Sequence, residues 1–164
     1  MIAIFRSSLA VLFLLCAGCG FQLRESVALN PLVKRLRIES VDQFSVLPQE
    51  LGRALLRSGV ELVEADDTDS SVLRILSDSQ ITQPLTFSGA ARVQEFLVVH
   101  RVEIEVLDAA GKPLLAKTLI ERERDYRFDE TLALGAAAED ELARNELRRD
   151  MVQAILRRIE AVGE

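Results

Sequence analysis

The clearest pattern in this chain is an alternation within residues 92–108, where Glu95, Arg101, Glu103 and Glu105 fall on one parity and a row of mostly apolar residues falls on the other. Successive side chains of a β-strand point to opposite faces of the sheet, so a period of two predicts a half-buried strand. A helix face would need a period near 3.6, which this segment lacks. The residues predicted to face the core are Phe96, Val98, His100, Val102, Ile104 and Val106.

Other segments share the extended pattern. Strands are predicted at residues 35–41, 72–84 and 114–128, and a brief extended segment is predicted at residues 60–64. Gly89 marks a hairpin loop at 86–91, and the sequence AAGKP at 109–113 marks a second turn. The last three strands therefore follow one another as a meander.

Two segments instead place apolar residues every three or four positions, the spacing of one helix face. The first helix is predicted over 46–58, with Pro48 in its first turn and Gly59 as its C-terminal stop. The second is predicted over about 139–161. The residues predicted to face the core are Leu47, Leu51, Leu55 and Leu56 on the first helix, and Leu142, Leu147, Met151, Ala154, Ile155, Ile159 and Val162 on the second.

The predicted order is therefore β-α-β-β-β-α. Each helix has one apolar face, and the apolar face of the sheet is the available partner for both. These features predict an α+β two-layer sandwich, with two helices on one face of a mostly antiparallel sheet of about four strands. One domain over residues 33–164 accommodates all of these elements.

The N-terminus has the pattern of a secretory signal over residues 1–18. Its apolar core, LAVLFLL at 9–15, is far shorter than the roughly 20 residues that cross a bilayer as a helix. Small residues directly before Cys19 match the bacterial lipoprotein box, in which the cysteine receives a diacylglycerol and the chain is cut before it. We expect Cys19 to be lipidated and residues 19–32 to form a tether.

Two other interpretations of this region are weaker. One is a soluble secreted protein cut at a different bond, in which neither cysteine has a role. The other is a redox or zinc site built from Cys16 and Cys19. Cys16 would leave with the signal, no further cysteine exists, and His100 is the only histidine.

Composition argues against nucleic-acid binding and against catalysis. The net charge is -6, and aromatic residues make up 5% of the chain with no Trp, whereas nucleic-acid partners need a basic face and stacking platforms. No nucleophile elbow, P-loop, HExxH or dinucleotide fingerprint occurs. His100 is interpreted as a core histidine satisfied by a hydrogen bond. The sequence thus predicts a protein that is not an enzyme and has no cofactor or bound metal.

Basic residues are the remaining candidates for a binding role. In the last strand Arg122, Arg124 and Arg127 alternate with acids, which predicts a positive sheet face for phosphates or a partner's acids. Arg92 follows the hairpin loop among neutral residues and is a candidate anion contact. The arginines of the last helix, Arg144 among them, are interleaved with acids, so a solvated charged face is favoured there.

Several short stretches resemble the LPS-assembly lipoprotein LptE family. The sequence AGCGFQLR at 17–24 is similar to the start of the mature chain in that family. The likeness continues at 36–39 and through LLRSGVELVE at 55–64. The strand pair and closing amphipathic helix also come in the expected order, so the resemblance spans the mature chain.

The resemblance implies an outer-membrane lipoprotein that sits in the lumen of the LptD β-barrel. There it would act as a plug and assembly partner while lipopolysaccharide passes to the outer leaflet. The lipidated cysteine of the family transfers to Cys19, and the absence of Asp at Gly20 fits sorting to the outer membrane. Family members bind lipopolysaccharide through basic residues, and by position Arg92 and Arg144 come nearest to them.

Two alternatives remain open at the level of the sequence. One is a lipoprotein accessory subunit of an ABC-type lipid transport system, also tethered and non-catalytic. The other is a lipid-anchored hydrolase facing the periplasm, which would need a cluster of reactive side chains that the sequence does not display.

Overall fold

The computed structural model describes residues 31–42, 44–64, 66–87, 89, 92–128 and 133–162. The predicted signal, Cys19 and nearly all of the predicted tether lie outside the described residues. The elements are a short 3-10 turn η1 (Pro31–Val33), β1 (Arg35–Ser40), α2 (Leu47–Arg57), β2 (Glu61–Leu62), β3 (Ser71–Phe87), β4 (Val93–Leu107), β5 (Pro113–Arg127) and α3 (Ala133–Glu160).

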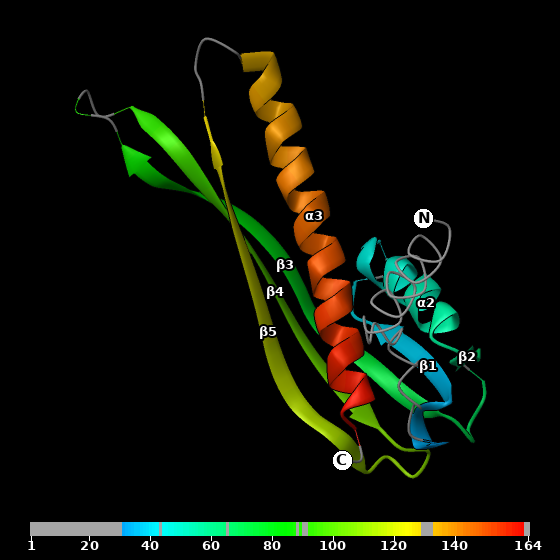
Figure 1. Ribbon diagram of the computed structural model, residues 1–164. Coiled ribbons are helices and arrows are strands. Elements are labelled where there is room, and N and C mark those ends of the chain that lie inside the picture. The colour runs from blue at the N-terminus through cyan, green and yellow to red at the C-terminus, as the bar shows by residue number, and fades with distance from the viewer. Residues whose placement is uncertain are drawn as a thin grey trace, which may run out of the picture.

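The strands form one sheet in the order β2-β1-β3-β4-β5, and α2 and α3 lie against the same face of it (Figure 1). The predicted α+β two-layer sandwich is therefore confirmed. The long ladders β3–β4 and β4–β5 are antiparallel, as the meander predicts. The sheet has five strands rather than four, because the extended segment after α2 contributes the two-residue strand β2.

The strands at the other edge make the sheet mixed. β1 pairs in parallel with both β2 and β3. Parallel neighbours need a crossover connection, and α2 supplies it between β1 and β2. Gly52 lets α2 approach these strands closely, since a Cβ at this position would lie 3.2 Å from Leu62 Cδ1.

The helix α2 ends close to Gly59, the residue predicted as its C-terminal stop. Gly59 has φ 85°, a left-handed conformation that glycine adopts without the steric cost of a Cβ. The N–H groups of Ser58, Gly59 and Val60 bond to the last carbonyls of the helix. Leu47, Leu51 and Leu55 are buried as predicted, whereas Leu56 is more than half exposed. Its prediction as a core residue is wrong, because the helix turns that position away from the sheet.

The core consists of two groups of buried side chains between the helices and the sheet. The larger group joins α2, β1, β3, β4 and the second half of α3, and its fully buried members include Leu36, Leu51, Leu55, Leu73, Ile104, Met151, Ile155 and Ile159. The smaller group contains Val98, Ala143 and Leu147, with Tyr126 packed against it.

The helix α3 begins at Ala133, about six residues before the predicted start. Leu142, predicted to face the core, is more than half exposed. Ala143 beside it is buried instead, which shows that the helix is rotated by about one position at this end. Among the helices of the described segments, none is long and apolar enough to cross a membrane.

Candidate functional site

A buried polar cluster lies where the sheet meets the start of α2. His100 on β4 is 1% exposed, and its Nε2 lies 2.7 Å from Asp78 Oδ1 on β3. Gln80 Nε2 donates to His100 Nδ1 at 3.2 Å, which assigns the ring proton to Nε2. Both ring nitrogens are therefore satisfied, and the interpretation of His100 as a core histidine is confirmed.

Asp78 connects this cluster to α2. The Ser45 hydroxyl donates to Asp78 Oδ2 at 2.6 Å, and Ser45 Oγ accepts from the Leu47 N–H at 3.1 Å. Burial alone would raise the pKa of Asp78, but the hydrogen bonds from His100 and Ser45 outweigh it and hold the pKa below the usual 3.8. The carboxylate thus fixes the first turn of the helix over the sheet.

A second polar cluster joins the first half of α3 to β3 and β5. Arg144 Nε donates to Asp140 Oδ2 at 2.7 Å, and Arg144 Nη2 donates to Thr82 Oγ1 at 2.5 Å. The hydroxyls of Thr82 and Tyr126 both donate to Asp140 Oδ1, at 3.0 and 3.2 Å. Gln80 Nε2 also donates to the Arg144 carbonyl oxygen at 3.3 Å and joins the two clusters.

These contacts shift the ionisation of two groups. Burial would raise the pKa of Asp140, yet the hydrogen bonds from Arg144, Thr82 and Tyr126 outweigh it and the pKa lies below 3.8. Burial, together with the charge of Asp140, raises the pKa of the Tyr126 hydroxyl. The second cluster is therefore built around an ionised carboxylate that the helix α3 presents to the sheet.

The lowered pKa values of Asp78 and Asp140 predict that the fold loses stability in acid. A carboxyl whose pKa is lower in the folded state stabilises the fold above its unfolded pKa, and the effect disappears as the pH falls through 3.8 and then through the folded value. We expect the free energy of unfolding, measured by urea denaturation, to fall below about pH 5. The difference between the parent chain and Asp140→Asn should shrink over the same window; a constant difference would contradict the assignment.

The predicted basic site residues lie in different settings. Arg92 is exposed and directly precedes β4 at the hairpin. Arg144 is half-buried, and its guanidinium group is engaged by Asp140 and Thr82. Cys19 lies outside the described residues. The roles of all three residues stay predictions.

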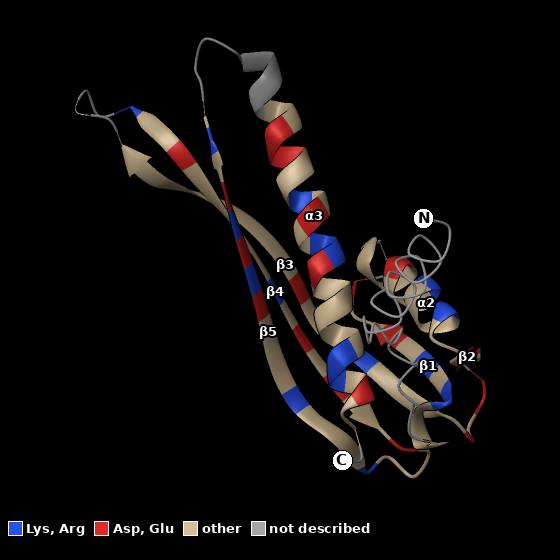
Figure 2. Cartoon of the chain, in the orientation of Figure 1, with Lys and Arg blue, Asp and Glu red and all other residues tan. Residues whose placement is uncertain are grey.

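The arginines of β5 do not form an open positive face. Arg122 and Arg124 pair in register with His100 and Val98, so they lie on the helix side of the sheet. Arg124 is held by Glu146 and Asp150 of α3, at 2.5 and 3.5 Å. Arg127 lies on the other side, 3.8 Å from Glu95. The alternating charges are visible as bands along β5 (Figure 2). Arg122 and Arg124 share one side of the sheet as predicted, but acids of α3 pair with Arg124, and Arg127 lies on the other side, so the prediction of a positive face for a partner is wrong.

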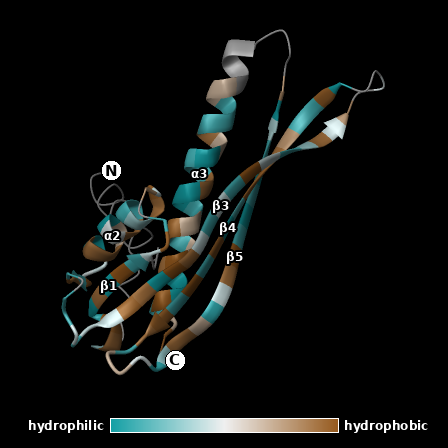
Figure 3. Ribbon diagram, turned by 180° about the vertical axis from the view of Figure 1, so that it is seen from behind, coloured by the Kyte–Doolittle hydropathy of each residue, from teal (hydrophilic) through white to brown (hydrophobic). Residues whose placement is uncertain are grey.

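The sheet face turned away from the helices has no second layer among the described elements (Figure 3). Ion pairs cross this face between strands, including Arg101 with Glu121 and Arg74 with Glu39. Large apolar side chains stand among them, with Ile81 45% and Leu119 60% exposed. We call this surface the open sheet face. Over the described residues, no group of three or more His, Cys, Asp or Glu side chains could hold a metal ion.

Comparison with known proteins gives a consistent result. A family model described as "LptE: Lipopolysaccharide-assembly" matches residues 33–159. The "LPS-assembly lipoprotein LptE" of Yersinia enterocolitica is 30% identical over 155 residues, which cover 92% of this chain and 72% of that protein. The protein of the same name from Pectobacterium atrosepticum is 26% identical, with 95% of this chain and 84% of that protein covered.

Solved structures agree. The solution structure of an uncharacterized lipoprotein B from Nitrosomonas europaea has a TM-score of 0.73 and 28% identity, and covers 87% of this chain and 91% of that one. The crystal structure of the rare lipoprotein B from Shewanella oneidensis has a TM-score of 0.67 and 28% identity, with 75% and 91% covered. On the family match, the related sequences and these folds, the chain belongs to the LptE family of lipopolysaccharide-assembly lipoproteins.

Proposed function

We propose that this chain is a lipid-anchored protein of the outer membrane that occupies the lumen of an LptD-type β-barrel. In this role it assists assembly of the barrel and delivery of lipopolysaccharide to the outer leaflet. Lipidated Cys19 is the proposed anchor, and Arg92 and Arg144 are the proposed contacts with lipopolysaccharide. The LptE family acts in lipopolysaccharide assembly and is not a family of enzymes, so the prediction of a non-enzymatic protein is confirmed.

The observation that carries the proposal is the open sheet face. The three long strands β3, β4 and β5 present a broad surface on which apolar side chains alternate with interstrand ion pairs. A barrel lumen is lined by alternating side chains of β-strands that are largely polar, so a mixed surface of this kind is complementary to it. Phe87, 60% exposed at the end of the β3–β4 hairpin, extends the same apolar character to the tip.

A permanent partner interface of this kind buries more than about 2,000 Å². Because the barrel would lose that contact area without its partner, we expect it to be recovered in low yield when this chain is absent. Affinity purification of the tagged full chain from detergent-solubilised envelopes, with identification of the co-purifying proteins, tests the proposal. Recovery of an inner-membrane ATPase in place of a β-barrel would overturn it in favour of the ABC-transporter alternative.

A substitution on the open sheet face sharpens this test. Leu119→Glu places a charge on an exposed position of β5. We expect it to lower recovery of the barrel by roughly tenfold or more, since the loss of an interface hot spot costs about 2 kcal/mol or more. Leu56→Glu is the matched control, because Leu56 is similarly exposed but lies on α2 in the helix layer. Equal recovery with both variants would show that the open sheet face is not the contact surface.

A further inference from the structure

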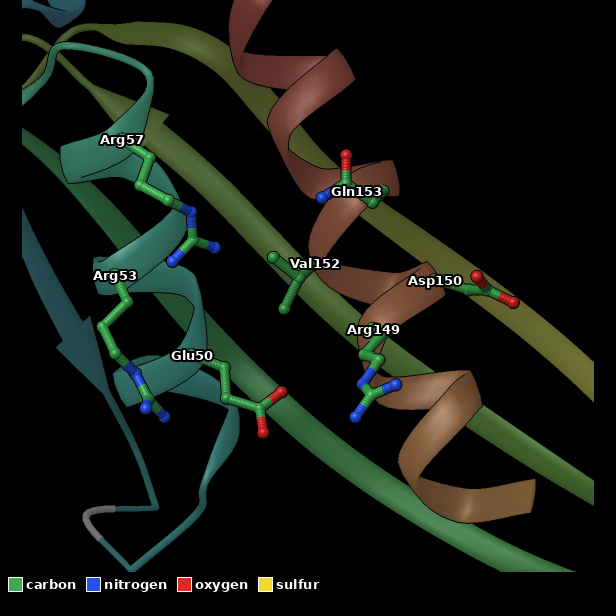
Figure 4. Close-up of a pocket in the computed structure, with 7 residues that line it drawn as sticks. All are labelled: Glu50, Arg53, Arg57, Arg149, Asp150, Val152 and Gln153. Carbon is green, nitrogen blue, oxygen red and sulfur yellow. The ribbon is translucent and has the colours of Figure 1, made fainter. Parts of the chain in front are cut away.

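A groove between α2 and α3 is lined by three arginines. Arg53 and Arg57 come from α2 and Arg149 from α3, and the groove that they line has a volume of about 410 Å³. Figure 4 shows Arg57 reaching from α2 toward α3, while Arg53 lies along α2, where its Nε donates to the Gln49 carbonyl oxygen at 3.4 Å. Within the described part of the chain, none of the three guanidinium groups makes an ion pair.

The two acids of the groove are each paired with a cation from outside it. Glu50 Oε1 lies 3.7 Å from Arg148 Nη1, and Asp150 Oδ2 lies 3.5 Å from Arg124 Nη2. Figure 4 shows the Asp150 carboxylate directed away from α2. The groove therefore holds an excess of positive charge, in a chain whose net charge is -6. Such a local excess attracts anions in spite of the overall charge of the protein.

The side chains indicate which kind of anion would fit. Each guanidinium presents a planar fork of N–H donors that matches the oxygens of a phosphate group. Buried Val152 gives one apolar wall, and the exposed amide of Gln153 can hydrogen-bond a hydroxyl. The volume lies within the usual range for small-ligand sites, roughly 300–1,000 Å³.

We propose that the groove between α2 and α3 binds a phosphate-bearing headgroup, with Arg53, Arg57 and Arg149 as the phosphate ligands. The groove lies in the helix layer, whereas the open sheet face lies on the other side of the sheet. This inference therefore goes beyond the proposed function, and each can fail without the other. Recovery of the barrel reports on the open sheet face, and the change of anion binding in variants of the groove reports on the groove.

Calorimetric titration of the full chain in a nonionic detergent tests the proposal. The ionic strength should be about 0.15 M, at which distant surface charges are screened. Three probes distinguish the source of the phosphate: pyrophosphate, mixed micelles that contain phosphatidylglycerol, and purified lipopolysaccharide. Binding of pyrophosphate assigns the site to the phosphate group itself, and binding of only one micellar probe assigns it to that headgroup.

Variants of the groove decide whether the binding is specific. Arg53→Ala, Arg57→Ala and Arg149→Ala should each weaken binding roughly tenfold, as expected for the loss of a charge-assisted hydrogen bond. Glu50→Gln should tighten binding, because it removes a negative charge from the groove. The control is Arg158→Ala, which removes an exposed arginine from the same helix but from a different pocket. All five positions are at the surface or partly exposed, and a thermal melt of each variant confirms that it is folded.

The expected pattern is three losses, one gain and an unchanged control. Binding that falls equally in Arg158→Ala would show a general charge effect and overturn the site. Affinity that is unchanged in the three groove variants, or no binding of any of the three probes to the parent chain, would overturn it as well.

Discussion

Replacing Ile155 by alanine is expected to lower the free energy of unfolding by about 2–5 kcal/mol, the range for large-to-small changes in a packed core. Ile155 is fully buried in the second half of α3, where that helix packs against α2 and the sheet. The substitution removes the contacts of a whole side chain and leaves a cavity that its neighbours fill only in part. Urea denaturation of parent and variant at neutral pH measures the difference.

Leu142→Ala is the matched control for this prediction. It removes an aliphatic side chain of the same volume from the same helix, but from a position that is more than half exposed. We expect a change within about 0.5 kcal/mol, as for most surface substitutions. Equal losses in both variants would contradict the orientation of α3 that the structure gives.

A second large effect is expected at Asp78. Asp78→Ala should destabilise the fold by about 3 kcal/mol, because the lost hydrogen bonds involve a charged group and the His100 donor stays buried. His100 Nε2–H would have no acceptor in the core, and Ser45 would lose the contact that joins the start of α2 to β3. Thermal or urea denaturation gives the size of the loss.

Asp78→Asn separates the hydrogen bonds from the charge. The amide keeps one oxygen that can accept from His100, so we expect roughly half of the loss seen in Asp78→Ala. It also removes the ionisable group, so the acid-dependent part of the stability that Asp78 supplies should disappear. A variant as unstable as Asp78→Ala would show that the negative charge, rather than the acceptor, holds the cluster together.

Much of the fold is predictable from the periodicity of its side chains. The alternation within 92–108 identified β4 and the side that carries Val98, His100, Val102, Ile104 and Val106, all of which are buried. The same reasoning missed the parallel pairing of β1 with β2 and β3, because pairing between distant segments leaves no periodic signal in either. It also placed Leu56 and Leu142 in the core, since a leucine at helical spacing has the same pattern whether or not a partner covers it.

The polar clusters were harder to predict than the strands. Asp78 is a charged residue in the middle of β3, and its carboxylate is satisfied by His100 and Ser45. The useful signal was that His100 lies on the apolar side of its strand, since a buried imidazole requires a partner. Which partner it has depends on the register of β3 with β4, where Gln80 lies opposite His100.

The division of the core into two groups has a consequence for how the molecule opens. The smaller group, around Val98, Ala143 and Leu147, buries far fewer side chains than the group around Ile155. Opening of a segment costs less free energy where less apolar surface holds it in place. Backbone amides in the first half of α3 and in the β4–β5 segment beneath it should therefore exchange their hydrogens with solvent sooner than those near Ile155, as a separate cooperative unit.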